Sequence, residues 1–181
     1  MTEEELLEQL KERNESAFRW LVENYQGRVY NTVLSILQHE PEAEDVAQEV
    51  FIKVFESIHS FRSESSLATW IYRISVHKSL DRLRKKKTRE KISVLFPWVK
   101  EPEETFHHPG VALDRKEKAA ILFAAIRQLP EKQHVAFTLV KVQGMTYEEV
   151  SVIMSQSVKS IESLISRAKI NLQKYLEQHR I

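Results

Sequence analysis

The chain has 181 residues, of which 42% are hydrophobic and 29% are charged, and it contains three glycines and no cysteine. This balance is typical of a soluble globular protein with one domain or two small ones, and it excludes disorder throughout. The lack of cysteine excludes a disulfide framework, a thiolate nucleophile and a cysteine zinc site. Three glycines are too few for Gly-rich phosphate loops or a turn-dense β-protein.

Apolar segments are short. The longest uninterrupted run covers residues 119–126, well below the roughly 18 residues that a membrane helix requires. The acidic segment 2–8 does not fit a signal peptide, whose first part is positively charged. We therefore expect a cytoplasmic protein with no membrane insertion.

Charge is distributed unevenly, although the net charge is only +1. Residues 1–60 carry 13 acidic and 5 basic side chains, whereas residues 61–100 carry 11 basic and 3 acidic ones. Such asymmetry predicts a polyanionic partner for the middle of the chain and a cationic protein surface for its start. For either segment alone, a solvated charged face is the alternative interpretation.

The sequence predicts several helices in the first half of the chain. Apolar residues recur every three or four positions over 18–37, where Gly27 is expected to bend or break the helix. Glu40-Pro41 is typical of a helix start, and an apolar stripe follows to Ile58 with acidic residues on the opposite side. After a polar segment at 60–66, another helix begins at Leu67 and runs into a basic stretch. We expect an all-helical domain over residues 1–92.

A second helical domain is expected over 113–181, after a flexible linker over 93–112 that contains three prolines. Leu129-Pro130 predicts a break between two helices, and Thr146 with Glu149 fits a capping box. A short helix, a tight turn at 155–157 and a longer helix then form a helix-turn-helix pattern. The fold class is therefore all-α, with two small domains, and the second helix of the motif can lie in a DNA major groove.

Residues 82–91 contain seven basic side chains and one acidic one. If about four of them neutralised phosphates, log affinity would fall with log salt at a slope of roughly −3 to −4. Aromatic rings just before this run can stack on unpaired bases, and Phe61 and Arg62, in an expected loop, are the best placed to do so. Burial in the core is an equally good interpretation of Trp70, and a solvated helix end is the alternative for the basic run.

The acidic side of the helix over 41–58 lacks compensating lysines at helical spacing, and like charges so spaced repel. A basic partner surface would balance it, and a solvated face is the alternative. Catalysis is disfavoured, because the seven histidines form no H-x-x-x-H pair and no spacing with carboxylates that indicates a metal site. We expect neither enzymatic activity nor a metal or other cofactor.

Several motifs in this order resemble the extracytoplasmic-function sigma factors of bacterial RNA polymerase. They are PEAEDVAQEVF at 41–51, FR at 61–62, TWIYRIS at 69–75, DRLR at 81–84, LPEKQ at 129–133, GMTYEE at 144–149 and SRA at 166–168. The resemblance implies two helical domains, one that docks on the polymerase and captures the melted −10 element, and one that reads the −35 element as duplex. It also implies contacts with the β′ clamp helices and the β flap, and an anti-sigma factor as a further partner.

The resemblance carries three sets of site residues onto this chain. Polymerase binding falls on Asp45, Gln48, Glu49 and Phe55. Reading of the −10 element falls on Phe61, Arg62, Ser63, Tyr72, Arg73, His77, Arg82 and Arg84. Reading of the −35 element falls on Ser157, Lys159, Ser160, Glu162, Ser163 and Arg167.

Three positions depart from the family pattern. His77 stands where relatives often have Asn, and Glu162 and Leu164 stand where they often carry Lys and Arg. Base preference at these positions is therefore open. Two other functions are also open: a regulator that binds duplex DNA alone through the helix-turn-helix, and a purely protein-binding helical module. Transcription with purified core enzyme separates the three.

Overall fold

A computed structural model describes residues 2–95 and 116–178, and the side chains of 2–89 and 119–178. The described residues form no β-strand, which confirms the expected all-α class. The helices in chain order are α1 (Glu3–Lys11), α2 (Glu15–Leu37), α3 (Glu40–Ser57), a 3₁₀ turn (Ile58–Ser60), α4 (Leu67–Leu95), α5 (Lys116–Arg127), α6 (Glu131–Phe137), a π-helical segment (Thr138–Val142), α7 (Tyr147–Met154) and α8 (Val158–Gln178).

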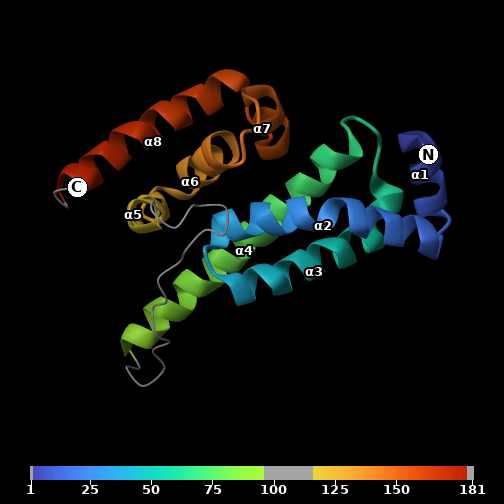
Figure 1. The fold of residues 1–181 in the computed structure, drawn as a ribbon, viewed down its shortest axis with the longest axis horizontal. Coiled ribbons are helices and arrows are strands. Elements are labelled where there is room, and N and C mark those ends of the chain that lie inside the picture. Colours follow the sequence, from blue (N-terminus) through green and yellow to red (C-terminus); the bar gives the residue numbers. More distant parts are fainter. Residues whose placement is uncertain (1, 96–115, 179–181) are drawn as a thin grey trace.

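In the N-terminal half, α2, α3 and α4 pack side by side, and α1 lies at one end of this layer (Figure 1). The apolar stripes expected from the sequence meet between these helices, where side chains such as Leu21, Leu34, Val50, Val54 and Ile71 are fully buried. Because each stripe follows the helical period, one face of every helix enters the core while the other stays in water.

Gly27 does not break α2, contrary to one of the two effects expected of it, since the helix runs unbroken from Glu15 to Leu37. A glycine in an exposed helix interior costs only about 1 kcal/mol relative to alanine. The buried residues on both sides of Gly27 hold the helix together in spite of that cost.

Local capping fixes several helix ends. The imidazole of His39 accepts the Glu42 N–H at 3.2 Å at the start of α3, as the Glu40-Pro41 signal predicts. Helix α1 was not predicted, although its signal is present as a capping box between Thr2 and Glu5. Its Glu3 carboxylate accepts the Leu67 N–H at 3.0 Å, so α1 helps to fix the start of α4.

In the C-terminal half, the break at Leu129-Pro130 and the helix-turn-helix are confirmed, with α7 and α8 joined by residues 155–157. Thr146 and Glu149 form the expected capping box. Ser155 ends α7 in the left-handed conformation, with φ of 52°. The π-helical segment after α6 was not predicted, because its single extra residue per turn leaves no clear mark on the hydrophobic period.

The two halves are packed against each other rather than apart. Helix α7 contacts α4, the π-helical segment contacts α2, and α8 lies on the far side of α6 and α7 (Figure 1). Ile36 and Val76 from the N-terminal half share a buried cluster with Val135, Leu139 and Ile153 from the C-terminal half. Most of the expected linker, residues 96–112, lies outside the described residues, and α4 extends to Leu95, beyond the expected domain end.

Candidate nucleic-acid interface

The outer face of α3 combines polar and apolar side chains. Asp45 and Gln48 are exposed, and Phe55, about two turns beyond Gln48, is 36% exposed. Ile52 lies on the same face at 58% exposure and was missed, although its spacing from Gln48 and Phe55 is that of one helix face. The Phe18 ring meets the Phe55 ring edge to face, with centroids 5.2 Å apart. This stripe offers apolar area flanked by polar groups to a partner helix.

Glu49 has a different environment from its neighbours on α3. Its carboxylate accepts hydrogen bonds from Arg82 at 2.9 Å and from Lys78 at 3.3 Å, both on α4. Partial burial tends to raise the pKa of Glu49, but the hydrogen bonds and charges of Lys78 and Arg82 outweigh it, so this pKa lies below its usual value. Asp45 lies 3.9 Å from Arg82. The acidic side of α3 is thus balanced in part from within the chain, which the helical spacing did not reveal.

The segment between the 3₁₀ turn and α4 contains the first expected DNA contacts. Arg62 and Ser63 are exposed, and Ser63 adopts the left-handed conformation with φ of 55°. Phe61 is only 5% exposed, and its ring packs on Trp70 with centroids 5.3 Å apart. Phe61 thus lies in a loop as expected, but its ring is buried, so little of it is accessible to a base in this structure.

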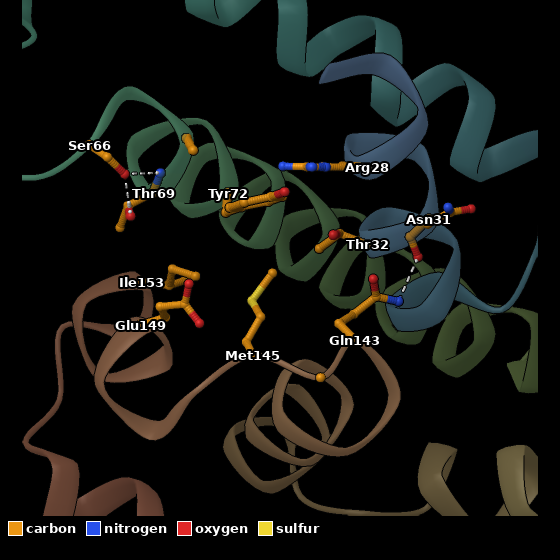
Figure 2. A pocket seen from close by; sticks show the side chains of 12 residues that line it. Arg28, Asn31, Thr32, Ser66, Thr69, Tyr72, Gln143, Met145, Glu149 and Ile153 are labelled. Carbon is orange, nitrogen blue, oxygen red and sulfur yellow. Dashed lines mark hydrogen bonds between the residues drawn. The ribbon is translucent and has the colours of Figure 1, made fainter. Parts of the chain in front are cut away.

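Tyr72, Arg73 and His77 are the expected DNA contacts on the first three turns of α4. His77 is exposed. Tyr72 lines a pocket between the halves, opposite Met145 and beside Arg28 (Figure 2). The Arg73 guanidinium donates from Nη2 to the backbone oxygen of Val152 on α7 at 2.7 Å. Two of these three residues are therefore engaged at the contact between the halves.

The basic run at the end of α4 is partly paired within the chain. Arg84 donates to both carboxylate oxygens of Glu131 on α6, from Nη2 at 2.6 Å and from Nε at 3.1 Å. These hydrogen bonds, with the charge of Arg84, hold the pKa of Glu131 below its usual value. Lys86 pairs with Glu42 at 3.6 Å. The remaining described bases of this run, Lys85, Lys87 and Arg89, are exposed.

Helix α8 has the two faces that a recognition helix requires. Ile161, Ile165, Ala168 and Leu172 are buried against the rest of the C-terminal half. The expected contact residues Lys159, Glu162, Ser163 and Arg167 are all exposed. At the start of the helix the Ser157 hydroxyl accepts the Ser160 N–H at 3.2 Å, and the Ser160 hydroxyl bonds to Gln156 at 3.0 Å. Of the set that the resemblance implies, Ser157 is also exposed and Ser160 is half-buried.

His134 on α6 is the described histidine with the most perturbed environment. Its side chain lies within the protein, and its Nε2 has no hydrogen-bond partner among the residues that the structure describes. Burial lowers the pKa of His134 to about 4, and the positive charges of Lys87 and Arg127 act in the same direction. Over the described residues, no three His, Asp or Glu side chains converge as metal ligands. No helix within 2–95 or 116–178 has the length and hydropathy to cross a bilayer.

In comparisons with known proteins, each half of the chain matches a different family model. The Sigma-70 region 2 family matches residues 21–89, and the Sigma-70 region 4 family matches residues 119–172. The chain is 31% identical over 181 residues to the RNA polymerase sigma-H factor of Pseudomonas aeruginosa, covering 97% of this chain and 94% of that protein. It is 31% identical over 175 residues to the ECF RNA polymerase sigma-E factor of Escherichia coli K12, covering 93% and 91%.

Two solved structures have the same fold. One is CnrH in complex with the cytosolic domain of CnrY, with a TM-score of 0.67 and 21% identity over 96% of each chain. The other is the sigma factor RpoE of Bartonella quintana in complex with the anti-sigma factor NepR, with a TM-score of 0.68 and 23% identity. That match covers 88% of this chain and 96% of the other.

Proposed function

Because this chain belongs to the extracytoplasmic-function sigma factors of the sigma-70 family, it is an RNA polymerase sigma factor, and we propose how its surfaces divide that work. The observation that carries the assignment is the presence of both Sigma-70 regions in order, one on each helical half. We assign residues 1–92 to polymerase docking and the −10 element, 93–112 to a linker, and 113–181 to the −35 element.

The outer face of α3 is the proposed docking surface for the β′ clamp helices of core polymerase. Asp45, Gln48 and Phe55 supply the polar and aromatic contacts, and Ile52 joins them because it is exposed on the same face. A buried apolar anchor surrounded by polar groups is the usual arrangement of a strong protein contact. Glu49 is turned toward Arg82 and Lys78, so its role is to support the face as well as to contact the partner.

The −10 element is proposed to bind along α4 and the segment before it. Arg62, Ser63 and His77 are exposed and available to bases, while Tyr72 and Arg73 lie where the C-terminal half contacts α4. Arg82 and Arg84 are proposed as phosphate contacts. Extruding a base costs a few kcal/mol, and stacking with hydrogen bonds can return a similar amount. Phe61 supports this surface from the core, since its ring is buried.

The −35 element is proposed to bind to α8 as duplex. Lys159 and Arg167 can contact phosphates or guanine, and Glu162 can accept from the amino group of cytosine. Ser157 caps the start of α8, and Ser160 and Ser163 lie on its first two turns, where their hydroxyls can contact a phosphate. A regulator that acts on duplex DNA without polymerase has no support in the two-region match. The C-terminal half is also proposed to contact the β flap.

Four further parts of the assignment follow from the family. The chain acts without a catalytic group of its own, since core polymerase performs nucleotidyl transfer, so we propose that it is not an enzyme. It works in the cytoplasm, where its polymerase is. One structural neighbour is bound to an anti-sigma factor and the other to the cytosolic domain of CnrY, which supports an anti-sigma factor as a partner here. No cofactor is required.

In-vitro transcription tests the proposal. Purified protein with core polymerase should give specific initiation that neither component gives alone, from a genomic library of the source bacterium. Asp45→Arg and Gln48→Ala should weaken co-purification with core by about tenfold or more, as loss of a central contact does. The matched control is Glu177→Arg, the same charge reversal at an exposed site on α8.

The outcomes separate the parts of the proposal. Unchanged core binding in both α3 variants would show that the docking face is misassigned. Absence of initiation by the wild-type protein with core polymerase would contradict the function itself.

A further inference from the structure

The segment over residues 61–66, between the 3₁₀ turn and α4, is anchored by a buried residue at each end. Phe61 at its start is 5% exposed, and Leu67, which follows it directly, is fully buried. Arg62 and Ser63 are exposed between these anchors, and the segment contains neither helix nor strand. Ser63 has a φ of 55°, a conformation that costs energy in most residues with a side chain. The conformation of the segment therefore depends on how its ends are held.

Helix α1 supports both ends of this segment. It contacts the 3₁₀ turn that precedes the segment, and it lies beside the chain that joins α3 to α4 (Figure 1). Three buried leucines of α1, Leu6, Leu7 and Leu10, belong to the same apolar cluster as Phe61 and Leu67. The apolar face of α1 is therefore part of the core on which the two ends of the segment rest.

A polar contact from α1 fixes the start of α4. The first N–H groups of a helix have no partner within the helix, and here Glu3 Oε1 accepts the Leu67 N–H at 3.0 Å. The Ser66 hydroxyl accepts the Thr69 N–H at 3.2 Å at the same helix start. A carboxylate near the positive end of a helix is also electrostatically favourable. Burial and the charge of Glu3 raise the pKa of Tyr25 on α2, so the carboxylate lies close to α2 as well.

Glu3 lies outside the Sigma-70 region 2 match, which begins at residue 21. We propose that Glu3 is a positioning residue for −10 recognition, because it fixes the start of α4 and with it the segment from which Arg62 and Ser63 reach the bases. The inference rests on the proposed function, since it uses the assignment of those two residues to the −10 element. Glu3 acts through the Leu67 N–H and makes no contact with DNA itself.

A fixed segment favours the reading of bases over binding of the DNA backbone. Hydrogen bonds weaken steeply once their angle falls below about 120°, so a side chain must be held in place to distinguish one base edge from another. Phosphate contacts carry no sequence information. Ordering a loose segment on binding also costs conformational entropy. Loss of the Glu3 contact should therefore lower selectivity among −10 sequences more than total affinity for DNA.

Three variants of α1 isolate this contact. Glu3→Ala removes the acceptor of the Leu67 N–H, whereas Glu3→Gln keeps a side-chain oxygen at the same position. Glu4→Ala is the matched control, because it removes an exposed carboxylate from the same first turn of α1. It reproduces the loss of negative charge at that helix start without removing the acceptor. All three should melt within a few degrees of wild type, since both side chains are exposed.

Amide hydrogen exchange, followed by NMR on the full chain without polymerase, measures the contact directly. In Glu3→Ala the Leu67 amide should exchange about three- to tenfold faster, in line with loss of one partly exposed hydrogen bond to a charged group. The Glu149 amide, which the Thr146 hydroxyl caps in the other half, should keep its rate. Glu3→Gln should restore most of the protection of Leu67, and Glu4→Ala should match wild type.

Transcription with core polymerase from a promoter library randomised at the −10 and −35 elements measures selectivity. Sequencing of the transcripts gives the base preference at each position. In Glu3→Ala the preference at the −10 element should fall about threefold or more, within the range that one good base contact supplies. The preference at the −35 element and co-purification with core should not change. Glu3→Gln should lie close to wild type, and Glu4→Ala should be indistinguishable from it.

Equal exchange of the Leu67 amide in Glu3→Ala and wild type would overturn the proposal. Faster exchange with an unchanged −10 preference would overturn it as well, because the contact would then hold the helix without affecting recognition. So would equal losses at the −10 and −35 elements, which indicate a general loss of stability. Absence of initiation by wild-type protein with core would contradict the proposed function, whereas the exchange measurement on the free protein would still decide whether Glu3 holds the start of α4.

Discussion

Arg82 on α4 donates to Glu49 on α3 at 2.9 Å. These two helices are joined by residues 58–66, which contain a 3₁₀ turn and no α-helix. Lys78 donates to the same carboxylate from one turn earlier on α4. Glu49 therefore holds α3 against α4. Asp45 lies 3.9 Å from the same Arg82 but stays exposed on the outer face of α3, as does Gln48.

We expect Glu49→Gln to lower stability by less than about 1 kcal/mol, since the pair is partly exposed to solvent. The pKa of Glu49 is lowered in the folded protein, so its contribution is present above the unfolded pKa and is lost as pH falls through the folded one. Urea unfolding at pH 7 and pH 4 measures this difference. Gln48→Ala, which changes an exposed side chain, should leave stability unchanged and weaken core binding. Equal stability curves for Glu49→Gln and wild type at both pH values would contradict the structural role.

Phe61→Ala should act on stability before it acts on DNA. The ring is 5% exposed and packs on Trp70, and truncating a buried phenylalanine costs about 3–5 kcal/mol. Phe61→Leu is the control, because it retains most of the apolar volume and should cost about 1.5 kcal/mol or less. Chemical denaturation measures both. If Phe61→Ala were as stable as wild type but failed in promoter melting, the result would contradict the structural role and indicate that the ring contacts DNA.

Thr146→Ala should loosen the helix-turn-helix. The Thr146 hydroxyl accepts the Glu149 N–H at 3.2 Å, and loss of such a cap costs about 1 kcal/mol. Thr2→Ala removes the same kind of capping box from α1, where the Thr2 hydroxyl accepts the Glu5 N–H at 3.2 Å. Both variants should melt at lower temperature, but only Thr146→Ala should weaken binding of duplex −35 DNA. Equal loss of duplex binding in the two variants would show that the effect is not local to the motif.

His134 should make the protein sensitive to acid. Its folded pKa is about 4 against an ordinary value of 6.5, so between these values the unfolded chain takes up a proton that the folded chain does not. Stability should therefore be fully retained above about pH 6.5 and fall on acidification to pH 4 by on the order of 3 kcal/mol. His134→Leu should flatten this part of the pH profile, as measured by urea unfolding, whereas His59→Leu, at an exposed ring, should not. An unchanged slope in His134→Leu would assign the acid sensitivity to other groups.

Local features of this fold could be predicted from the sequence. The start of α3 at Glu40-Pro41, the break at Leu129-Pro130 and the capping box at Thr146 depend on residues within one or two helical turns. The apolar face of α8 also follows from its period, whereas the contact set from Lys159 to Arg167 was named from the family resemblance and is exposed on the structure, apart from the half-buried Ser160. These interactions are short in sequence, and each is decided by the chemistry of a few adjacent side chains.

Only the tertiary structure decided which of the charged and aromatic residues remain available. The burial of Phe61, the attachment of Glu49 to Arg82 and the pairing of Arg84 with Glu131 join residues that lie 9, 33 and 47 positions apart. The same holds for the seam in which Ile36 and Val76 meet Val135. Helical periodicity states which face of a helix is apolar, but it contains no information on which other helix covers that face. That choice depends on packing over the whole chain, and it determines which residues the protein can offer to polymerase and to DNA.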